Sequence, residues 1–343
     1  MNIWLFRAGK HGEYENKFLE DKRVYLTWDD LNINLKEYPD KRVLELLLIE
    51  KYNLEKEKTA TNWVSQILPI AHRMEVGDWV VLPSKVNRTI HFGKITGDYC
   101  HNPYAENPYY HYREVNWFAT DIPRDNFEQD ILYSMGAFMT VCRIHKNNAK
   151  DRLLAMEKNN WKVPNKVVLN QVGENEIEDN EENLDLEEIV ADRISKHIIR
   201  NFKGHKMEIL IEEILKAKGF TTFRSPEGAD NGVDILASPN TLGFGSPKIC
   251  VQVKTTDSPV DRPTMDQLIG TMSNVNAEYG LLVSWSGFKS SVKKEIPKQF
   301  FRLRLWDSAQ IIKQIFESYE LLSDEIKSEI PLKRVWMLNN EDI

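Results

Sequence analysis

Residues 248–256, KICVQVKTT, contain the strand that decides both the fold and the chemistry of this chain. Side chains alternate between the two faces of an extended strand. Val251 and Val253 are therefore expected to point into a core, while Gln252 and Lys254 share the opposite face. An amide and an ammonium group side by side on a strand with one apolar face predict a polar site at the border of that core.

The segments around this strand alternate between helical and extended patterns. Apolar residues recur every four positions from Leu186 to Phe202 and predict a helix, and a second helix is expected from His205 until Gly219 stops it. Further strands are predicted at 233–237, 249–254, 279–285 and 301–306, with helices at 265–272, from Lys289 and from Ser308. The C-terminal part is therefore expected to be a mixed α/β domain.

The first 160 residues have a different pattern, rich in tryptophan and in glycine at predicted corners. Strands are expected at 2–9, 23–28, 77–83 and 89–99, and helices at 42–52 and 61–74. This order predicts an α+β domain built on a small, partly open β-barrel with helices on its rim.

An acidic run separates the two parts. Nine acids and no base lie between Glu174 and Glu188, and without them the formal charge of the chain changes from −7 to +2. We expect a solvated linker, and the alternative is an acidic segment that mimics phosphate and occupies a DNA-binding groove. The predicted domains are therefore 1–160, an acidic linker with a connecting helix at 161–203, and 204–343.

Composition excludes several classes of protein. No apolar run approaches the roughly 18 residues of a membrane helix, and the N-terminus lacks the features of a signal peptide. The three cysteines show no CxxC spacing, and the histidines lack zinc-finger spacing, so we expect neither a disulfide framework nor zinc. We predict a cytoplasmic protein without a membrane partner.

Four polar side chains form a candidate catalytic and metal site. If 233–237 and 249–254 are neighbouring strands, Asp234 lies close to Gln252 and Lys254, and Glu208 borders the buried stripe of its helix. Asp234, Gln252 and Glu208 provide an all-oxygen ligand set that suits Mg²⁺, for which Mn²⁺ can substitute. Together with the cation Lys254, such a site is suited to phosphodiester hydrolysis.

These motifs, in their order and spacing, resemble one known family. GHKMEILIEEILKAKGF, SPEGADNGVDILA, VQVK, MDQLIGTM and GLLVSWSGFKSSVKKE are similar to the Mrr-type restriction endonuclease domain of the PD-(D/E)xK nuclease superfamily, over residues 204–320. The resemblance implies an αβββαβ core that cuts DNA with Mg²⁺. It places Asp234 as principal metal ligand, Gln252 and Lys254 as a Q-x-K pair, and Glu208 as the helix carboxylate.

Other positions are weaker candidates for DNA contact. The resemblance implies an orienting or DNA-contacting role for Gln267 in the helix after the Q-x-K strand. Arg302 and Arg304 alternate onto one strand face and could meet phosphate, or could simply blunt an exposed edge. The chain has no GxxxxGK[ST] loop, so we expect no requirement for a nucleoside triphosphate within it.

The N-terminal domain shows a partial likeness to PUA-like base readers such as the EVE and SRA groups. Residues 98–117, DYCHNPYAENPYYHYREVNW, are dense in Tyr, His and Asn, which can stack on a base or fill a core. We predict a base-reading pocket lined by residues among Trp28, Tyr99, Tyr112 and Trp117.

The combined prediction is a Mg²⁺-dependent DNA endonuclease of type IV restriction or anti-phage defence, acting on double-stranded DNA that carries modified bases. Two alternatives remain: a defence nuclease activated by a nucleotide signal or a phage protein, and a catalytically silent DNA-binding or scaffold protein. Because Mrr-type nucleases usually cut two strands, we expect a homodimer or higher oligomer.

Overall fold

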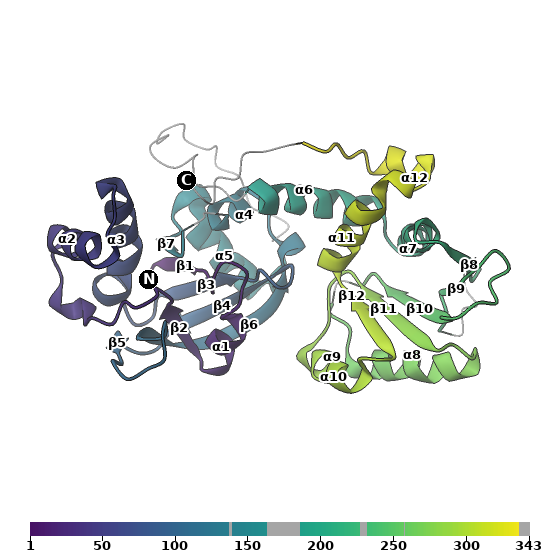
Figure 1. Cartoon of the computed structure of the whole chain (residues 1–343), viewed down its shortest axis with the longest axis horizontal. Helices are drawn as coiled ribbons and strands as arrows, with labels where there is room; N and C mark the ends of the chain where they lie inside the picture. Colours follow the sequence, from purple (N-terminus) through teal and green to yellow (C-terminus); the bar gives the residue numbers. More distant parts are fainter. Residues whose placement is uncertain (137–138, 163–185, 227–231, 257, 336–343) are drawn as a thin grey trace. The chain divides into compact units, whose positions relative to one another are not determined.

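The computed structural model describes residues 1–136, 139–162, 186–226, 232–256 and 258–335. It forms two compact units, Met1–Asp192 (unit 1) and Arg193–Ile343 (unit 2), which are considered separately (Figure 1). The division falls inside helix α6 (Leu186–Asn201), the helix predicted from the four-residue apolar repeat. The acidic run up to Asp185 lies outside the described residues.

Unit 1 is built on a seven-stranded sheet. Its order is β2-β6-β4-β3-β1-β7, with β5 paired to β6. Among the ladders of the described strands, β1 and β3 pair in parallel and the others are antiparallel. The strands are β1 (Ile3–Phe6), β2 (Arg23–Leu26), β3 (Trp79–Pro83), β4 (Thr89–Ile95), β5 (Cys100–His101), β6 (His111–Pro123) and β7 (Val141–Arg143). Within the described residues no ladder joins β7 to β2, so the PUA-like barrel stays a prediction.

Helices cover both faces of this sheet. They are α1 (Glu15–Glu20), α2 (Lys41–Tyr52), α3 (Glu57–His72), α4 (Gln129–Met135) and α5 (Ala149–Lys158), with short 3-10 turns η1 (Leu35–Glu37), η2 (Arg124–Asn126) and η3 (Lys146–Asn148). Alternate β1 residues point to opposite faces: Phe6 packs with Leu44 and Val64 of α2 and α3, and Leu5 packs with Ile131 of α4. Two separate cores result.

Trp161 extends unit 1 beyond the predicted boundary at residue 160. Its indole is buried and stacks on Phe92, with 4.0 Å between the ring centroids. Glu188 also differs from the prediction. It is part of the acidic run that was expected to be solvated, yet its carboxylate is largely buried against Arg124. The first turns of α6 therefore belong to unit 1.

Unit 2 is a five-stranded sheet of order β12-β11-β10-β9-β8. The strands are β8 (Phe220–Arg224), β9 (Ile235–Pro239), β10 (Ile249–Lys254), β11 (Tyr279–Ser284) and β12 (Leu303–Trp306). β8, β9 and β10 pair antiparallel, whereas β10, β11 and β12 are parallel. With α7 (His205–Ala217) before β8 and α8 (Arg262–Asn274) between β10 and β11, the order is αβββαβ, as the family resemblance implied.

The helices of unit 2 also lie on two faces. Figure 1 shows α7 and α11 (Ser308–Ser318) on one side of the sheet and α8 on the other. The remaining helical segments are α9 (Ser290–Lys293), α10 (Ile296–Gln299), η5 (Tyr319–Leu321) and α12 (Asp324–Glu329). Side-chain caps fix the starts of two helices: Asp261 accepts a hydrogen bond from Thr264 N, and Asp307 accepts one from Gln310 N.

None of the helices formed by the described residues is both long and apolar enough to cross a membrane.

Candidate active site

Strand β10 separates two cores in the way that its alternation predicts. Val251 and Val253 pack with α7 and α11, whereas Cys250 packs with α8. Gln252 is two residues from Cys250, so it lies on the α8 face, and Lys254 follows on the same side at the end of the strand.

Asp234 immediately precedes β9 and is held against β10. Its N–H donates to the carbonyl of Val251 at 3.1 Å, and its Oδ2 accepts from the N–H of Val253 at 2.5 Å. The residue is only 4% exposed. Burial, and then the charge of Asp234, raises the pKa of the Cys250 thiol to about 11. The carboxylate therefore lies beside the backbone that carries Gln252.

The buried side chain of Gln252 has a hydrogen-bond acceptor without a donor among the described residues. The residue is 1% exposed, and within the part of the chain that the structure describes its Oε1 has no hydrogen-bond partner. A Cβ added to Gly232 would lie 3.8 Å from Nε2 of Gln252, 3.6 Å from Nε2 of Gln267 and 3.2 Å from Oγ1 of Thr271. Amides from β10 and α8 thus converge beside Gly232, two residues before Asp234.

Glu208 lies in the first turn of α7, at the same end of the sheet. The N–H of Gly204, the N-cap of α7, donates to Oγ1 of Thr255 at 3.1 Å, and Thr255 directly follows Lys254. Oε2 of Glu208 is 2.8 Å from Nδ1 of His205, one helical turn earlier. The start of α7 and the end of β10 are therefore adjacent.

Two charged residues that the sequence analysis did not identify, Arg224 and Glu212, are connected to Glu208 through His205. Arg224 of β8 contacts the ring of His205 and donates through Nε to Glu212 at 2.9 Å. Burial alone would raise the pKa of Glu212, but hydrogen bonds from Arg224 and Thr222 hold it below its ordinary value. The His205–Glu208 spacing of three residues was the available signal, since such pairs meet on a helix surface.

The donor set fits a hard divalent cation. Asp234 offers a fixed carboxylate, and Gln252 offers a carbonyl oxygen that lacks another partner, which is the kind of ligand that Mg²⁺ accepts. A buried acceptor without a partner costs about 1–3 kcal/mol. The site thus has a physical reason to take up a cation. Among the described residues, no three His, Cys, Asp or Glu side chains gather as a ready-made metal site. Lys254 and Glu208 complete the candidate site only if their side chains lie beside Asp234 and Gln252, as the sequence analysis predicts.

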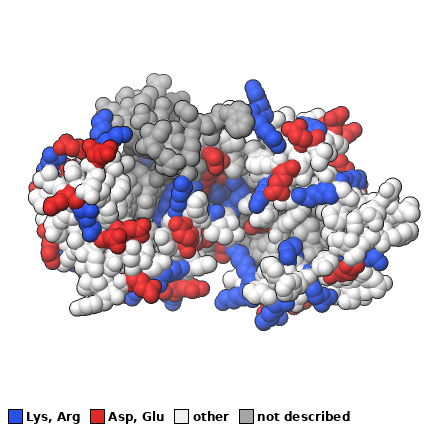
Figure 2. All heavy atoms as spheres, in the orientation of Figure 1, with Lys and Arg blue, Asp and Glu red and all other residues white. Residues whose placement is uncertain are grey.

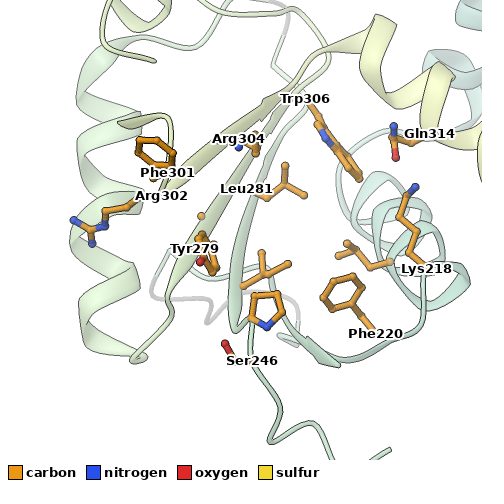
Figure 3. Close-up of a pocket in the computed structure, with 14 residues that line it drawn as sticks. Lys218, Phe220, Ser246, Tyr279, Leu281, Phe301, Arg302, Arg304, Trp306 and Gln314 are labelled. Atoms are coloured by element: carbon orange, nitrogen blue, oxygen red, sulfur yellow. The ribbon is translucent and has the colours of Figure 1, made fainter. Parts of the chain in front are cut away.

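Arg302 and Arg304 lie away from this end of the sheet. Arg304 pairs with Leu281, and Leu281 pairs with Val251, so Arg304 faces the α7 and α11 side rather than the α8 side. Both arginines line a pocket of about 500 Å³ with Ile249, at the beginning of the parallel strands (Figure 3). Trp306, Phe220, Lys218 and Gln314 also line this pocket. The two arginines and the predicted metal ligands are therefore not parts of one site.

Tyr99, predicted to line a base-reading pocket, is held inside unit 1. Its hydroxyl accepts from Leu35 N at 3.1 Å and is 2.8 Å from Nδ1 of His111. Nε2 of His111 is 2.6 Å from the carbonyl of Leu31, so the neutral ring donates there and accepts from Tyr99. Burial lowers the pKa of His111 to about 4.

The other three predicted base-reading residues have different surroundings. Trp28 packs edge-on against Trp63, with centroids 5.7 Å apart. Trp117 donates from Nε1 to the carbonyl of Phe18 at 3.0 Å, and the guanidinium of Arg23 lies 4.1 Å from the ring centroid of Tyr112. All three are partly buried against the same core cluster that contains Tyr99, and the base-reading role of the four residues stays a prediction.

Two family models match parts of the chain. One, Mrr_cat, described as a restriction endonuclease, matches residues 199–315. The other, DUF8426, is a domain of unknown function and matches residues 4–145. No curated protein matches the chain.

Several solved structures are distantly similar. "MspJI Restriction Endonuclease in Complex with 27-mer Oligonucleotide" shares 16% identity over 42% of this chain and 36% of its own, with a TM-score of 0.32. "DNA modification-dependent restriction endonuclease AspBHI" shares 12% over 74% of this chain and 67% of its own, with a TM-score of 0.31. A protein of unknown function, AF1548, shares 15% over 33% of this chain and 65% of its own, with a TM-score of 0.25. The chain spans about a third of the length of MspJI.

Proposed function

We propose that this chain, whose residues 199–315 form a restriction endonuclease domain of the Mrr_cat family, is a Mg²⁺-dependent DNA endonuclease that acts on DNA carrying modified bases. The observation that supports the metal site best is the buried Oε1 of Gln252, which has no hydrogen-bond partner in the described structure and belongs to the residue before Val253, whose N–H binds Asp234.

The proposed chemistry assigns one task to each side chain. A bound Mg²⁺ would polarise a phosphoryl oxygen and lower the pKa of the attacking water. Asp234 and Gln252 would hold that ion, and Glu208 would serve as a further carboxylate at the same end of the sheet. The ammonium of Lys254 would stabilise negative charge that develops on the phosphate, which is worth most in a site sheltered from water. His205 would orient Glu208 through its 2.8 Å contact.

Lysines near the end of β10 support DNA as the substrate. The N–H of Lys289 donates to the carbonyl of Val260 at 2.9 Å, which joins the start of α9 to the loop that follows β10. Lys293 ends α9, Lys294 follows it as the C-cap, and Lys298 lies in α10. Figure 2 shows Lys and Arg side chains gathered over this part of unit 2. Such a cluster is suited to contact phosphates without reading sequence.

Unit 1 would be the reader of the modified base. Support comes from the partial likeness of its sequence to PUA-like readers and from the match of residues 199–315 of the same chain to a restriction endonuclease model. A homodimer or higher oligomer would allow both strands to be cut, and the molar mass in solution tests this part directly.

Cleavage assays on matched substrates test the proposed function. The full chain is incubated with Mg²⁺ and with unmodified, methylated or hydroxymethylated duplexes of one sequence. We expect cleavage of a modified duplex by the wild type and none by Lys254→Ala. Equal cleavage of all duplexes would contradict the modified-base proposal. Absence of cleavage under every condition, with either Mg²⁺ or Mn²⁺, would favour a silent DNA-binding protein.

A further inference from the structure

Four cationic side chains of unit 1 converge on the first turns of α6. They come from separate parts of the chain: Arg7 follows β1, Lys85 and Arg88 lie between β3 and β4, and Arg124 begins η2. We call these four residues the cradle. The residues that occupy it are Glu188 and Asp192, one helical turn apart on α6.

Asp192 makes the shortest contacts with the cradle. Arg124 binds it with two parallel hydrogen bonds, from Nε to Oδ1 at 2.9 Å and from Nη2 to Oδ2 at 2.7 Å. Nη2 of Arg88 also donates to Oδ1 at 2.6 Å. The side chains of Arg124 and Asp192 are each 2% exposed, so this pair is almost completely removed from water. Arginine binds carboxylate and phosphate in the same two-pronged geometry.

Glu188 occupies the other side of the cradle. Its Oε1 lies 2.9 Å from Nη1 of Arg124, and its Oε2 lies 3.4 Å from Nη2 of Arg7 and 3.7 Å from Nζ of Lys85. A third acid, Asp125, lies at the edge of the cradle, 3.9 Å from Nη2 of Arg88. Two carboxylates on one helix face therefore meet four cations.

The cradle offers more donors than these carboxylates use. Nε of Arg88 and Nη1 of Arg124 are buried and make no hydrogen bond to any described residue. Although Nη1 of Arg124 is near Glu188, the angles do not form a hydrogen bond. Phosphate groups present more acceptor oxygens than carboxylates do, and nucleic-acid backbones are contacted mainly by Arg and Lys.

Ion pairing is also an unusual way to fasten a helix permanently. Burial alone would raise the pKa of Asp192 and lower that of Arg124. Their mutual attraction, with that of Arg88 and Glu188, reverses both shifts. The desolvation cost of such pairs means that apolar residues of similar volume often hold a contact as well or better. Charge pairing has a specific advantage where the anionic partner is to be exchanged for another anion.

We propose that the cradle is a surface with which unit 1 contacts DNA phosphates, and that Glu188 and Asp192 of α6 occupy it as phosphate mimics when DNA is absent. This inference rests on the proposed function in one respect, that DNA is the partner. It adds the location of a backbone contact and a competition within the chain for that contact.

DNA-binding measurements on the full chain test the proposal. Cleavage is prevented by Asp234→Asn in every protein, and affinity for duplex DNA is measured at several salt concentrations. Glu188→Gln with Asp192→Asn should bind about tenfold more tightly, and its salt dependence should steepen by about one unit for each additional phosphate that the protein neutralises. Adding Arg88→Gln should reverse both changes. The control is Glu187→Gln, which removes one negative charge from the exposed face of α6, against two in the double variant, and should change neither quantity.

A second variant keeps the test decisive if the double substitution loosens unit 1. Lys85→Gln removes a peripheral member of the cradle and leaves the Arg124–Asp192 pair intact. We expect it to weaken DNA binding and to reduce the salt dependence by about one unit. Unchanged affinity and salt dependence in both Lys85→Gln and Arg88→Gln would overturn the proposal and leave the cradle as a structural fastening. Lack of DNA binding by the parent protein would instead refute the proposed function.

Discussion

The cradle of unit 1 and the candidate active site of unit 2 are both buried polar clusters, but they differ in what they lack. In the cradle, carboxylates balance the guanidinium charges, and Asp192 accepts two hydrogen bonds from Arg124, although Nη1 of Arg124 and Nε of Arg88 have no hydrogen-bond partner among the described residues. In the active site, Gln252 has a buried carbonyl oxygen that no described residue satisfies. The difference teaches that the charges of the first cluster are balanced within the chain, whereas the second presents a buried acceptor oxygen that the proposed cation would satisfy.

Asp234→Asn should have the largest effect of the substitutions considered, on both cleavage and Mg²⁺ binding, and it tests the candidate active site. Asparagine can still accept the hydrogen bond from Val253, so the fold should persist while the carboxylate charge is lost. Cleavage should fall by at least about a thousandfold, the scale of a major electrostatic contribution to catalysis. Calorimetry should also show weaker Mg²⁺ binding. Asp266→Asn, on the exposed face of α8, is the control. A loss of cleavage rate of less than about tenfold in Asp234→Asn would contradict the assignment of Asp234 as a metal ligand.

A double-mutant cycle on the Arg124–Asp192 pair tests how much this ion pair of the cradle contributes to stability. Asp192→Leu alone leaves a buried guanidinium with fewer partners and should lower the free energy of unfolding by about 3–5 kcal/mol. Arg124→Met together with Asp192→Leu should recover most of that loss, because an apolar contact replaces the ion pair. Chemical denaturation measures all four proteins. Equal stability of the two variants would show that the ion pair does not govern the docking of α6.

The buried ring of His111 makes unit 1 sensitive to mild acid. Its folded pKa of about 4 lies below its ordinary value of about 6.5, so its contribution to stability is complete above that value and is lost as the pH falls towards 4. The loss should reach about 3 kcal/mol, from 1.36 kcal/mol per unit. Thermal unfolding of wild type and His111→Gln between pH 7 and 4 measures it. His145→Gln, at an exposed position, should keep the wild-type pH dependence.

Gln252→Glu sharpens the comparison by adding a charge where the active site has only an amide. The metal-free protein should melt at a lower temperature, since a second buried carboxylate would lie near Asp234. The Mg²⁺ concentration for half-saturation should fall by about tenfold, because a charged ligand binds the cation more strongly. Melting temperatures across a Mg²⁺ titration report both effects. Gln314→Glu on α11 serves as the control, and equal responses of the two variants would contradict the metal site.

Local patterns predicted much of the fold. The apolar repeats of α6 and α7 and the alternation of β10 follow from nearest neighbours along the chain, and each lies where the sequence analysis expected it. Four strands were missed, namely β5, β6, β7 and β8. β8 is an edge strand with little burial, so its alternation carries a weak signal, and β5 and β7, with two and three residues, are too short for a periodic pattern. The start of β6 lies in 98–117, whose aromatic residues were considered for stacking on a base or filling a core.

Long-range ion pairs could not be predicted at all. Arg7 and Glu188 are 181 residues apart, and nothing in the local sequence of either residue identifies the other. The same limit applies to Arg304: only the pairing of β12 with β11 and of β11 with β10 shows that its face of the sheet is opposite to Gln252. Sequence patterns thus predicted which residues share a face more reliably than which faces meet.

The conformation of Gly232 has a practical consequence for work on this protein. Its φ of +82° belongs to the region that other residues rarely adopt, and an added methyl group would lie 3.2 Å from Oγ1 of Thr271. Replacement by alanine would therefore disturb the backbone between two amide side chains while leaving every charged group in place. Such a protein would have the same net charge as the wild type, so any loss of cleavage in it would report the position of the backbone rather than the loss of a charge.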